Sequence, residues 1–189
     1  MKKTLIYITI VILVIIGFGI ISNPIRNTGP IFTNFEPTPI VTNFEQCVTA
    51  GNAIMESYPR QCRAGEQTYT ENIGNELEKT NLIRIDSPRP NTIIQSPLVV
   101  TGQARGNWFF EASFPVMLTD WDGLIIAEGH ATAKSDWMTT DFVPFEATLN
   151  FTVDKNVYSN RGSLILKKDN PSGLPKNDDA IEIPVTFAQ

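Results

Sequence analysis

The sequence has very few of the residues that metal and redox sites need. Among its 189 residues there are one histidine and two cysteines. With His130 alone, a zinc site of two cysteines and two histidines is impossible. Fourteen residues separate Cys47 from Cys62, so the Cys-x-x-Cys spacing that tunes a reactive thiolate is absent too. We therefore expect neither a metal centre nor a thiol oxidoreductase, and we predict no cofactor.

Basic residues are also scarce. The chain has 15 Lys and Arg against 20 Asp and Glu, which gives a formal net charge of −5. Lys2 and Lys3 precede a long apolar segment, so the remaining sequence has 13 basic residues and a net charge of −7. Proteins that bind nucleic acid present a basic stripe or patch to the phosphates. No such stripe is present here, so we predict no nucleic-acid partner.

Charge is absent altogether from residues 5–21, which are dense in Ile, Val and Leu. Seventeen uncharged, mostly apolar residues are at the short end of what spans a bilayer. We predict an uncleaved membrane anchor in residues 1–21, with a cleaved signal peptide as the alternative. Lys2 and Lys3 would stay in the cytoplasm, because positive charge is retained on that side. The expected location is the cell membrane, single-pass, with the C-terminal part extracytoplasmic.

Residues 22–46 contain four prolines and an internal duplication. Residues 30–36 read PIFTNFE, and residues 39–45 read PIVTNFE. Proline fixes φ and removes a backbone donor, so neither a helix nor a central strand is expected. We interpret this segment as a tether. The duplication is either a short docking motif or a slipped repeat in a tolerant linker.

Residues 47–80 are predicted to form a small module around Cys47 and Cys62. In an exported segment, an even number of thiols favours a disulfide. A loop of about fifteen residues closed in this way gains about 3 kcal/mol in the chain-entropy model. The module is therefore expected to be closed by a disulfide between these two cysteines.

Residues 81–189 alternate apolar and polar side chains over short runs bounded by turn residues, which is typical of half-buried strands. Pro184 interrupts the last run, so that strand is expected at an edge or a bulge. Seven such strands predict an all-β, immunoglobulin-like antiparallel β-sandwich. The strands are expected at residues 81–85, 98–105, 109–119, 124–133, 142–153, 162–168 and 180–187, with a brief pairing at 92–94.

Several motifs of this region resemble a known family. They are TGQARGNWFFEASFP at residues 101–115, DG at 122–123, DWM at 136–138 and DFVPFE at 141–146. The region from about residue 85 to 187 resembles the immunoglobulin-like domain associated with bacterial spore germination proteins, the Gmad family of the second type. This resemblance implies an extracytoplasmic bacterial sandwich that serves in binding or assembly, with no catalytic residues. Residues 47–71 are similar to a small cysteine-paired module of exported bacterial proteins, which implies no activity.

Aromatic side chains supply the candidate interaction surface. Trp108 and Phe110 share the core parity of their strand, so Phe109 is expected on the outer face beside Glu111. Trp121 in a turn and Trp137 in a loop could stack a glycan at one end of the sandwich. The alternatives are cover of Phe109 by a neighbouring loop, and packing of the two tryptophans to anchor their loops.

Carboxylates offer an enzymatic alternative, because two of them beside a cleft can act as acid and base on a wall glycan. Asp120 to Gly123 resembles part of a calcium loop, but these residues are also typical of a turn. His130 shares parity with solvent-facing neighbours, and the sequence has no Gly-x-Ser-x-Gly motif. The candidate carboxylates are Glu111, Asp120, Asp122, Glu128, Asp136, Asp141 and Glu146.

The sequence thus predicts a membrane-anchored, extracytoplasmic and non-catalytic module of the bacterial cell envelope. Its expected partner is an envelope protein or glycan, and its expected contact with the membrane is through residues 5–21. The alternatives are a hydrolase that acts on wall glycan with surface carboxylates, and a purely structural spacer.

Overall fold

The computed structural model describes residues 40–154, 156 and 158–188. The predicted anchor and most of the predicted tether lie outside this part, so both remain predictions. Within the described residues, no helix is long and apolar enough to cross a membrane. Residues 40–189 form one compact unit.

The cysteine module folds around its disulfide. Cys47 and Cys62 are bonded to each other and fully buried, which confirms the predicted pairing. Phe44 packs against them, and the guanidinium of Arg60 lies 5.4 Å from its ring centroid. The Asn43 side chain caps the helix by accepting a hydrogen bond from the Gln46 N–H at 2.8 Å. The elements are α2 (Phe44–Thr49), β1 (Ile54–Met55), β2 (Gln61–Ala64) and β3 (Gln67–Thr70).

Helix α2 begins inside the last residues of the predicted tether. The second copy of the duplicated motif includes Asn43 as the cap and Phe44 as a buried residue of the module. Glu45, also from this copy, forms an ion pair with Arg161 of the sandwich at 3.3 Å. The second copy is therefore part of the folded module.

The rest of the described chain forms an eight-stranded sheet, together with the short helix α3 (Glu76–Lys79) and two 3-10 turns, η1 (Gly106–Trp108) and η2 (Pro175–Asn177). The expected strands are present, and the brief pairing at 92–94 is a strand of its own. The order in the sheet is β4-β6-β9-β8-β7-β10-β11-β5. The strands are β4 (Ile83–Ser87), β5 (Ile93–Ile94), β6 (Leu98–Arg105), β7 (Ser113–Asp120), β8 (Ile125–Ala133), β9 (Phe142–Leu149), β10 (Arg161–Lys167) and β11 (Ala180–Phe187).

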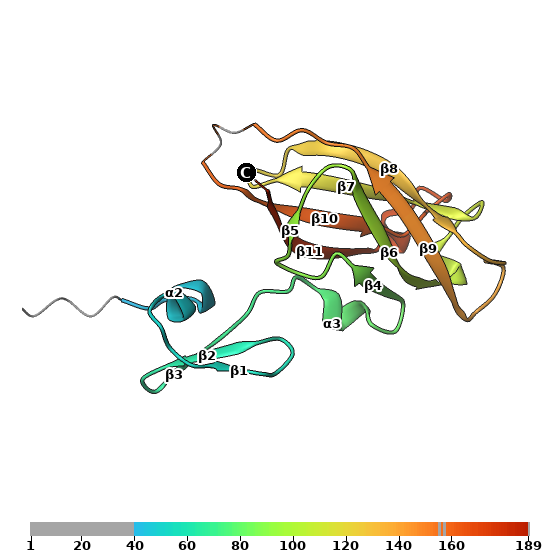
Figure 1. Cartoon of the computed structure of the whole chain (residues 1–189). Coiled ribbons are helices and arrows are strands. Elements are labelled where there is room, and N and C mark those ends of the chain that lie inside the picture. The colour runs from blue at the N-terminus through green and yellow to red at the C-terminus, as the bar shows by residue number, and fades with distance from the viewer. Residues whose placement is uncertain (1–39, 155, 157, 189) are drawn as a thin grey trace, which may run out of the picture. The chain divides into compact units, whose positions relative to one another are not determined.

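The sheet folds over on itself to make the two layers of a sandwich (Figure 1). Strands β8 and β9 form the corner, because they share only two residue pairs, Thr132 with Glu146 and Ala133 with Phe145. One layer contains β4, β6 and β9, and the other contains β8, β7, β10, β11 and β5. The predicted all-β sandwich is confirmed, but its sheet has eight strands and is mixed rather than wholly antiparallel, because β5 pairs in parallel with β11.

Alternating side chains fill the space between the layers. In β6 and β9 every second residue is buried, as the period of a pleated strand requires. Phe114 of β7 meets Phe145 of β9 edge to face, with ring centroids 5.0 Å apart. Such pairs stabilise the fold beyond their buried area, by about 0.5–1.5 kcal/mol.

The segment between β6 and β7 departs from the expected alternation. The 3-10 turn η1 and the positive φ angles of Glu111 (50°) and Ala112 (61°) delay the start of β7 to Ser113. Phe109 is consequently 4% exposed, with its ring centroid 5.1 Å from that of Phe114. Phe110 is 41% exposed. The prediction that Phe109 faces outward and Phe110 inward is wrong.

Arg89 covers part of the outer edge of β4. The side chains of Ile83 and Ile85 are almost completely buried in the core of the sandwich. The Arg89 side chain donates a hydrogen bond from Nη1 to the Ile85 carbonyl at 2.5 Å. Cover of this kind disfavours pairing of an edge strand with another chain.

The outer edge of β11 is bridged by the chain that leads from the module to β5. Asn75 and Glu182 exchange two hydrogen bonds. The Asn75 N–H donates to the Glu182 carbonyl at 3.2 Å, and the Glu182 N–H donates to Asn75 Oδ1 at 2.8 Å. Next along the strand, the Asn91 N–H donates to the Pro184 carbonyl at 2.7 Å. Pro184, which has no N–H, therefore faces the outer edge of β11 at a point before β5 begins. No ladder hydrogen bond is lost there, as expected for a proline at an edge.

Candidate binding cleft at one end of the sandwich

The cleft arises where the chain changes layers. Strand β5 pairs in parallel with the end of β11, whereas β6 begins at Leu98 and pairs with β9 in the other layer. Residues 95–97 make this change. The β6–β9 register, Leu98 opposite Leu149, would place residue 96 opposite 151 and residue 94 opposite 153. Because residue 94 has joined the other layer, the chain beyond β9 has no strand beside it.

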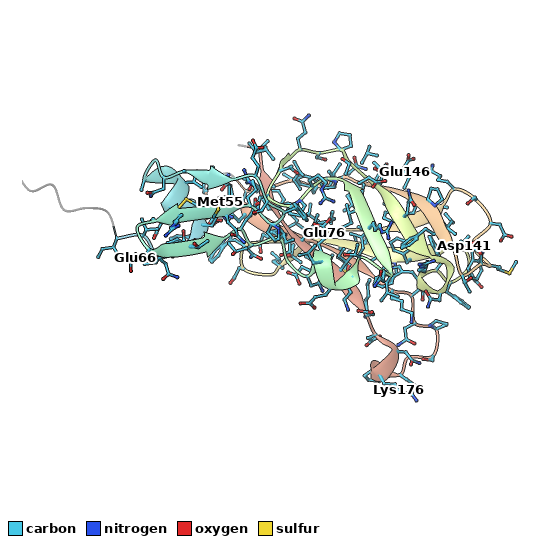
Figure 2. All side chains as sticks on the ribbon, turned by 90° about the horizontal axis from the view of Figure 1, so that it is seen from below. Met55, Glu66, Glu76, Asp141, Glu146 and Lys176 are labelled. Carbon is cyan, nitrogen blue, oxygen red and sulfur yellow. A yellow bond between two sulfur atoms is a disulfide. The ribbon has the colours of Figure 1, made fainter. Side chains whose placement is uncertain are left out.

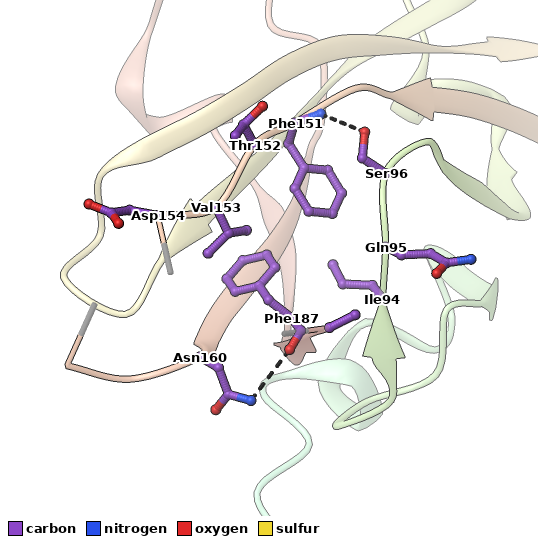
Figure 3. A pocket seen from close by; sticks show the side chains of 10 residues that line it. Ile94, Gln95, Ser96, Phe151, Thr152, Val153, Asp154, Asn160 and Phe187 are labelled. Atoms are coloured by element: carbon purple, nitrogen blue, oxygen red, sulfur yellow. Dashed lines mark hydrogen bonds between the residues drawn. The ribbon is translucent and has the colours of Figure 1, made fainter. Parts of the chain in front are cut away.

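A cavity of about 490 Å³ occupies this position. Figure 3 shows Ile94, Phe151, Val153 and Phe187 pointing toward one another into it. Ile94 and Phe187 are buried, and the Phe151 ring centroid lies 5.6 Å from that of Phe187. The floor is therefore apolar, and the volume is in the range of about 300–1,000 Å³ that is usual for ligand pockets. We call this cavity the end cleft.

Hydrogen bonds fix the walls of the end cleft (Figure 3). The Phe151 N–H donates to Ser96 Oγ at 3.0 Å, which joins the two walls at one point. At the other side, the Phe187 N–H donates to the Asn160 carbonyl at 2.7 Å, and Asn160 Nδ2 donates to the Phe187 carbonyl at 3.4 Å. The cleft is thus built from connections that the sandwich itself holds in place.

The same end of the sandwich exposes an aromatic pair. Trp121, in the turn between β7 and β8, is 45% exposed, and Tyr158, in the loop before β10, is 90% exposed. Their ring centroids lie 5.4 Å apart. Asp120 Oδ1 shapes the turn by accepting hydrogen bonds from the N–H groups of Asp122 at 3.0 Å and Leu124 at 2.9 Å. Asp120 is therefore a turn residue, which is what the turn interpretation predicts.

Trp121 and Trp137 do not form a pair. Trp121 follows β7 and Trp137 follows β8, so they lie at opposite ends of the same hairpin. Trp137 is half-buried and packs against the core, and its loop presses on Gly106, where a Cβ would come within 2.3 Å of the Trp137 carbonyl oxygen. The two tryptophans are therefore too far apart in the fold to stack on one sugar ring together, and for Trp137 the alternative of packing that anchors its loop agrees with the structure. Glu111 lies at the Trp137 end, away from the end cleft.

The candidate carboxylates are distributed over the molecule. Asp120 and Asp122 lie at the cleft end, whereas Asp136 and Asp141 lie in the loop between β8 and β9 at the other end. Asp141 and Glu146 are at different places on the surface (Figure 2), and Glu146 pairs with Lys134 at 2.9 Å.

Two further titratable side chains were candidates for chemistry. Glu128 and His130 are both exposed on β8, and for His130 this agrees with its parity. Within the described residues, no group of three or more His, Cys, Asp and Glu could hold a metal ion.

Two buried glutamates, Glu71 and Glu76, were not predicted from the sequence. Glu71 accepts hydrogen bonds from Arg60 at 2.6 and 2.8 Å and from Asn91 Nδ2 at 3.0 Å. The hydrogen bonds from Arg60 lower the pKa of Glu71, and burial opposes them less strongly. Glu76 accepts a hydrogen bond from the Tyr58 hydroxyl and pairs with Arg89 at 2.5 Å. Both carboxylates are neutralised by arginine, and both fasten the chain between the module and β4.

The residues of the end cleft were also missed as a site, because residues 142–153 were expected to form one strand. Strand β9 ends at Leu149 instead, and Phe151 and Val153 become the wall of a cavity. One signal in the sequence points to this end. Pro97 fixes φ directly before Leu98, and proline is typical of the start of a strand.

Residues 82–173 match the family model described as the immunoglobulin-like domain of bacterial spore germination. This range begins just before β4 and continues past β10, so it covers most of the sandwich. No curated protein and no solved structure matches the chain. The expected resemblance to the Gmad family of the second type is confirmed for this range, and the sandwich of this chain is similar to that immunoglobulin-like domain.

Proposed function

We propose that the protein is a non-catalytic binding module of the bacterial cell envelope, which binds another envelope protein through the end cleft. One observation carries this proposal. The cleft has an apolar floor of Ile94, Phe151, Val153 and Phe187 that is open at the surface. An open apolar cavity with polar groups at its rim is the usual form of a binding site. The predicted anchor in residues 5–21 would hold this site above the membrane.

A binding role is favoured over hydrolysis of wall glycan by the placement of the acidic residues. A glycosidase needs two carboxyl groups across one groove, about 5–10 Å apart. Here Asp120 and Asp122 belong to one end of the sandwich, and Asp136 and Asp141 to the other. Immunoglobulin-like domains are also typically binding modules rather than enzymes.

A protein is favoured over a glycan as the partner. Glycan sites usually offer flat, exposed aromatic faces together with polar groups. The floor of the end cleft is made of aliphatic side chains and of two phenyl rings tilted by 59° to each other. Such a floor suits an aliphatic or aromatic side chain of a polypeptide.

Photocrosslinking in the native envelope tests this proposal. A photoreactive residue at Gln95, on the rim of the cleft, is expected to form an adduct with a protein. The same residue at Asp136, at the opposite end, is expected to form none. Val153→Glu should abolish the Gln95 adduct, because it places a charge in the apolar cavity. Thr148→Glu adds the same charge to an exposed residue of β9 outside the lining of the cleft, and it should leave the adduct unchanged.

Three results would contradict the proposal. Equal adducts from both ends would show non-specific contact. An adduct that glycan-degrading enzymes remove would make the partner a glycan. No adduct from Gln95, in a protein whose disulfide has formed, would favour a structural spacer.

A further inference from the structure

Building on the proposed function, we propose that the end cleft takes its partner as an added β-strand. The occupant would be an extended peptide segment with an apolar side chain flanked by Lys or Arg. It would lie along residues 151–153, in the position that β6 leaves empty when the chain changes layers. This inference fixes the mode of binding and the chemistry of the partner, which the proposed function leaves open.

The backbone beside the cleft has free hydrogen-bonding groups. The Phe151 N–H points toward Ser96, so the odd-numbered residues here direct their N–H and C=O groups to the cleft. The even-numbered residues face the other way, because the Pro144 carbonyl accepts a hydrogen bond from the Lys134 N–H on the β8 side. Among the described residues, the Phe151 carbonyl and both backbone groups of Val153 have no hydrogen-bond partner. These three groups are the pattern that an antiparallel strand would satisfy.

Two other edges of the sandwich carry cover. Arg89 donates to the Ile85 carbonyl at the edge of β4. The edge of β11 is bridged by Asn75 and Asn91. At residues 151–153 only the Phe151 N–H has a partner within the described residues, and an apolar cavity lies directly alongside. Free backbone groups and an apolar side-chain pocket therefore occur together here.

The side-chain chemistry follows from the pleat. A strand placed beside residues 151–153 would direct alternate side chains toward Phe187 and Ile94, the floor of the cavity. An apolar residue there would bury its surface, and a charged residue would lose its hydration. The residues before and after it would point outward, to the rim.

Charge complementarity selects Lys and Arg for those outward positions. The sequences of the two connections at this end of the sandwich, residues 120–124 and 150–160, contain three acidic residues and one basic residue, for a net charge of −2. Asp120, Asp122 and Asp154 form no ion pair among the described residues. The exposed rings of Trp121 and Tyr158 could also stack on a guanidinium group. A basic, amphipathic extended peptide therefore fits this end best.

Selection from a display library of random short peptides against the detergent-solubilised full chain tests the inference. Peptides that bind the wild type and Thr148→Glu but not Val153→Glu are kept. Both variants add one negative charge to the same stretch of chain, so a peptide held by charge alone should bind both. The kept peptides are expected to carry an apolar residue flanked by Lys or Arg. Near-ultraviolet circular dichroism checks that both variants are folded.

The strand itself is tested with synthetic versions of the strongest peptide. Backbone N-methylation on the edge that faces residues 151–153 should weaken binding at least about ten-fold, since two or three hydrogen bonds are lost. N-methylation on the opposite edge should leave binding unchanged. When the peptide is bound, amide hydrogen exchange should be slower than in the free protein at Val153, whose N–H faces the cleft. Exchange should be unchanged at Thr152, whose N–H faces away.

The outcomes separate the two proposals. If no peptide depends on the cleft, or if the kept peptides are acidic, this inference is overturned, while the Gln95 crosslink still measures the proposed function. If N-methylation of either edge has the same effect, the cleft binds a side chain and not a strand, and the strand mode is wrong.

Discussion

Phe109 and Phe110 are neighbours in the chain with opposite surroundings, and this contrast can be measured. Phe109→Ala should lower the free energy of unfolding by about 3–5 kcal/mol, because it empties a buried site against Phe114. Phe110→Ala should change it by less than about 1 kcal/mol, because that ring is 41% exposed. Urea denaturation of the two full-length variants gives both values. Similar losses in both would contradict the surroundings described here.

The sequence could not predict this contrast. Glu111 and Ala112 have left-handed φ angles, which are uncommon for residues other than glycine, asparagine and aspartate. A turn built from such residues has no compositional signal, so the alternation of residues 109–119 was extended through it. The prediction that Trp108 is buried is confirmed, and Trp108 precedes the two left-handed residues.

Glu71 makes the stability depend on pH in a definite direction. Its hydrogen bonds from Arg60 lower the pKa of its carboxyl in the folded state. The stabilisation is therefore fully present above the pKa of an unfolded glutamate, about 4.3, and is lost as the pH falls through the lowered folded value. Glu71→Gln should cost about 1.5–3 kcal/mol at pH 7, the value of charged hydrogen bonds.

The measurement is chemical unfolding of wild type and Glu71→Gln between pH 7 and pH 3. The difference between the two proteins should be constant down to about pH 5 and then shrink. A matched variant, Glu66→Gln, alters an exposed carboxylate of the same module and should behave as the wild type does. A difference that grows in acid would show that the charged form of Glu71 is not the stabilising one.

At the scale of elements, the strands were predictable and their partners were less so. Alternation located β6, β8 and β11 to within a residue or two, since each has one face in the core. The parallel pairing of β5 with β11 joins residues more than ninety positions apart, and nothing in either segment specifies it. The end of β9 at Leu149 follows from that pairing, because β5 is the strand that would otherwise continue beside it.

The cover along β11 depends on one glycine. Gly74 has a φ of 70°, and a Cβ on it would lie 1.9 Å from the Glu182 carbonyl oxygen. Gly74→Ala should therefore destabilise by more than 1 kcal/mol and detach the Asn75 bridge. Gly65→Ala is the matched control, because Gly65 has a φ of 61° but open space around it. It should show the backbone penalty alone, about 1 kcal/mol.

Hydrogen exchange distinguishes these two effects. In Gly74→Ala, the amide of Glu182, which donates to Asn75, should exchange faster, while amides of β6 and β9 stay protected. In Gly65→Ala, faster exchange should be confined to β2 and β3. Equal stability of the two variants would mean that the close approach at Gly74 does not hold this connection in place.

At the scale of the whole molecule, the end cleft is assembled from parts that are distant in the chain. Its walls come from the β5–β6 connection, the chain after β9 and the end of β11. Each part looks like an ordinary strand end or loop when read alone. The aromatic pair likewise joins Trp121, which was a candidate, to Tyr158, which was not. The binding that we propose at this end would require the complete fold, so the sequence predicted a binding module without locating the proposed site.

The proposed function also depends on where the module is held, and this can be tested directly. Residues 5–21 would form a helix of about 26 Å, slightly shorter than a hydrocarbon core of about 30 Å, which a bilayer accommodates by local thinning. The protein should therefore remain in the membrane pellet after alkaline carbonate extraction. The mass of the intact protein should correspond to a chain that begins at Met1 or, after removal of Met1, at Lys2. A chain beginning at residue 22 behind a cleavable signal should be released, with its disulfide formed. An intact mass that lacks residues 1–21 in the native protein would show cleavage, and the cleft would then act away from the membrane.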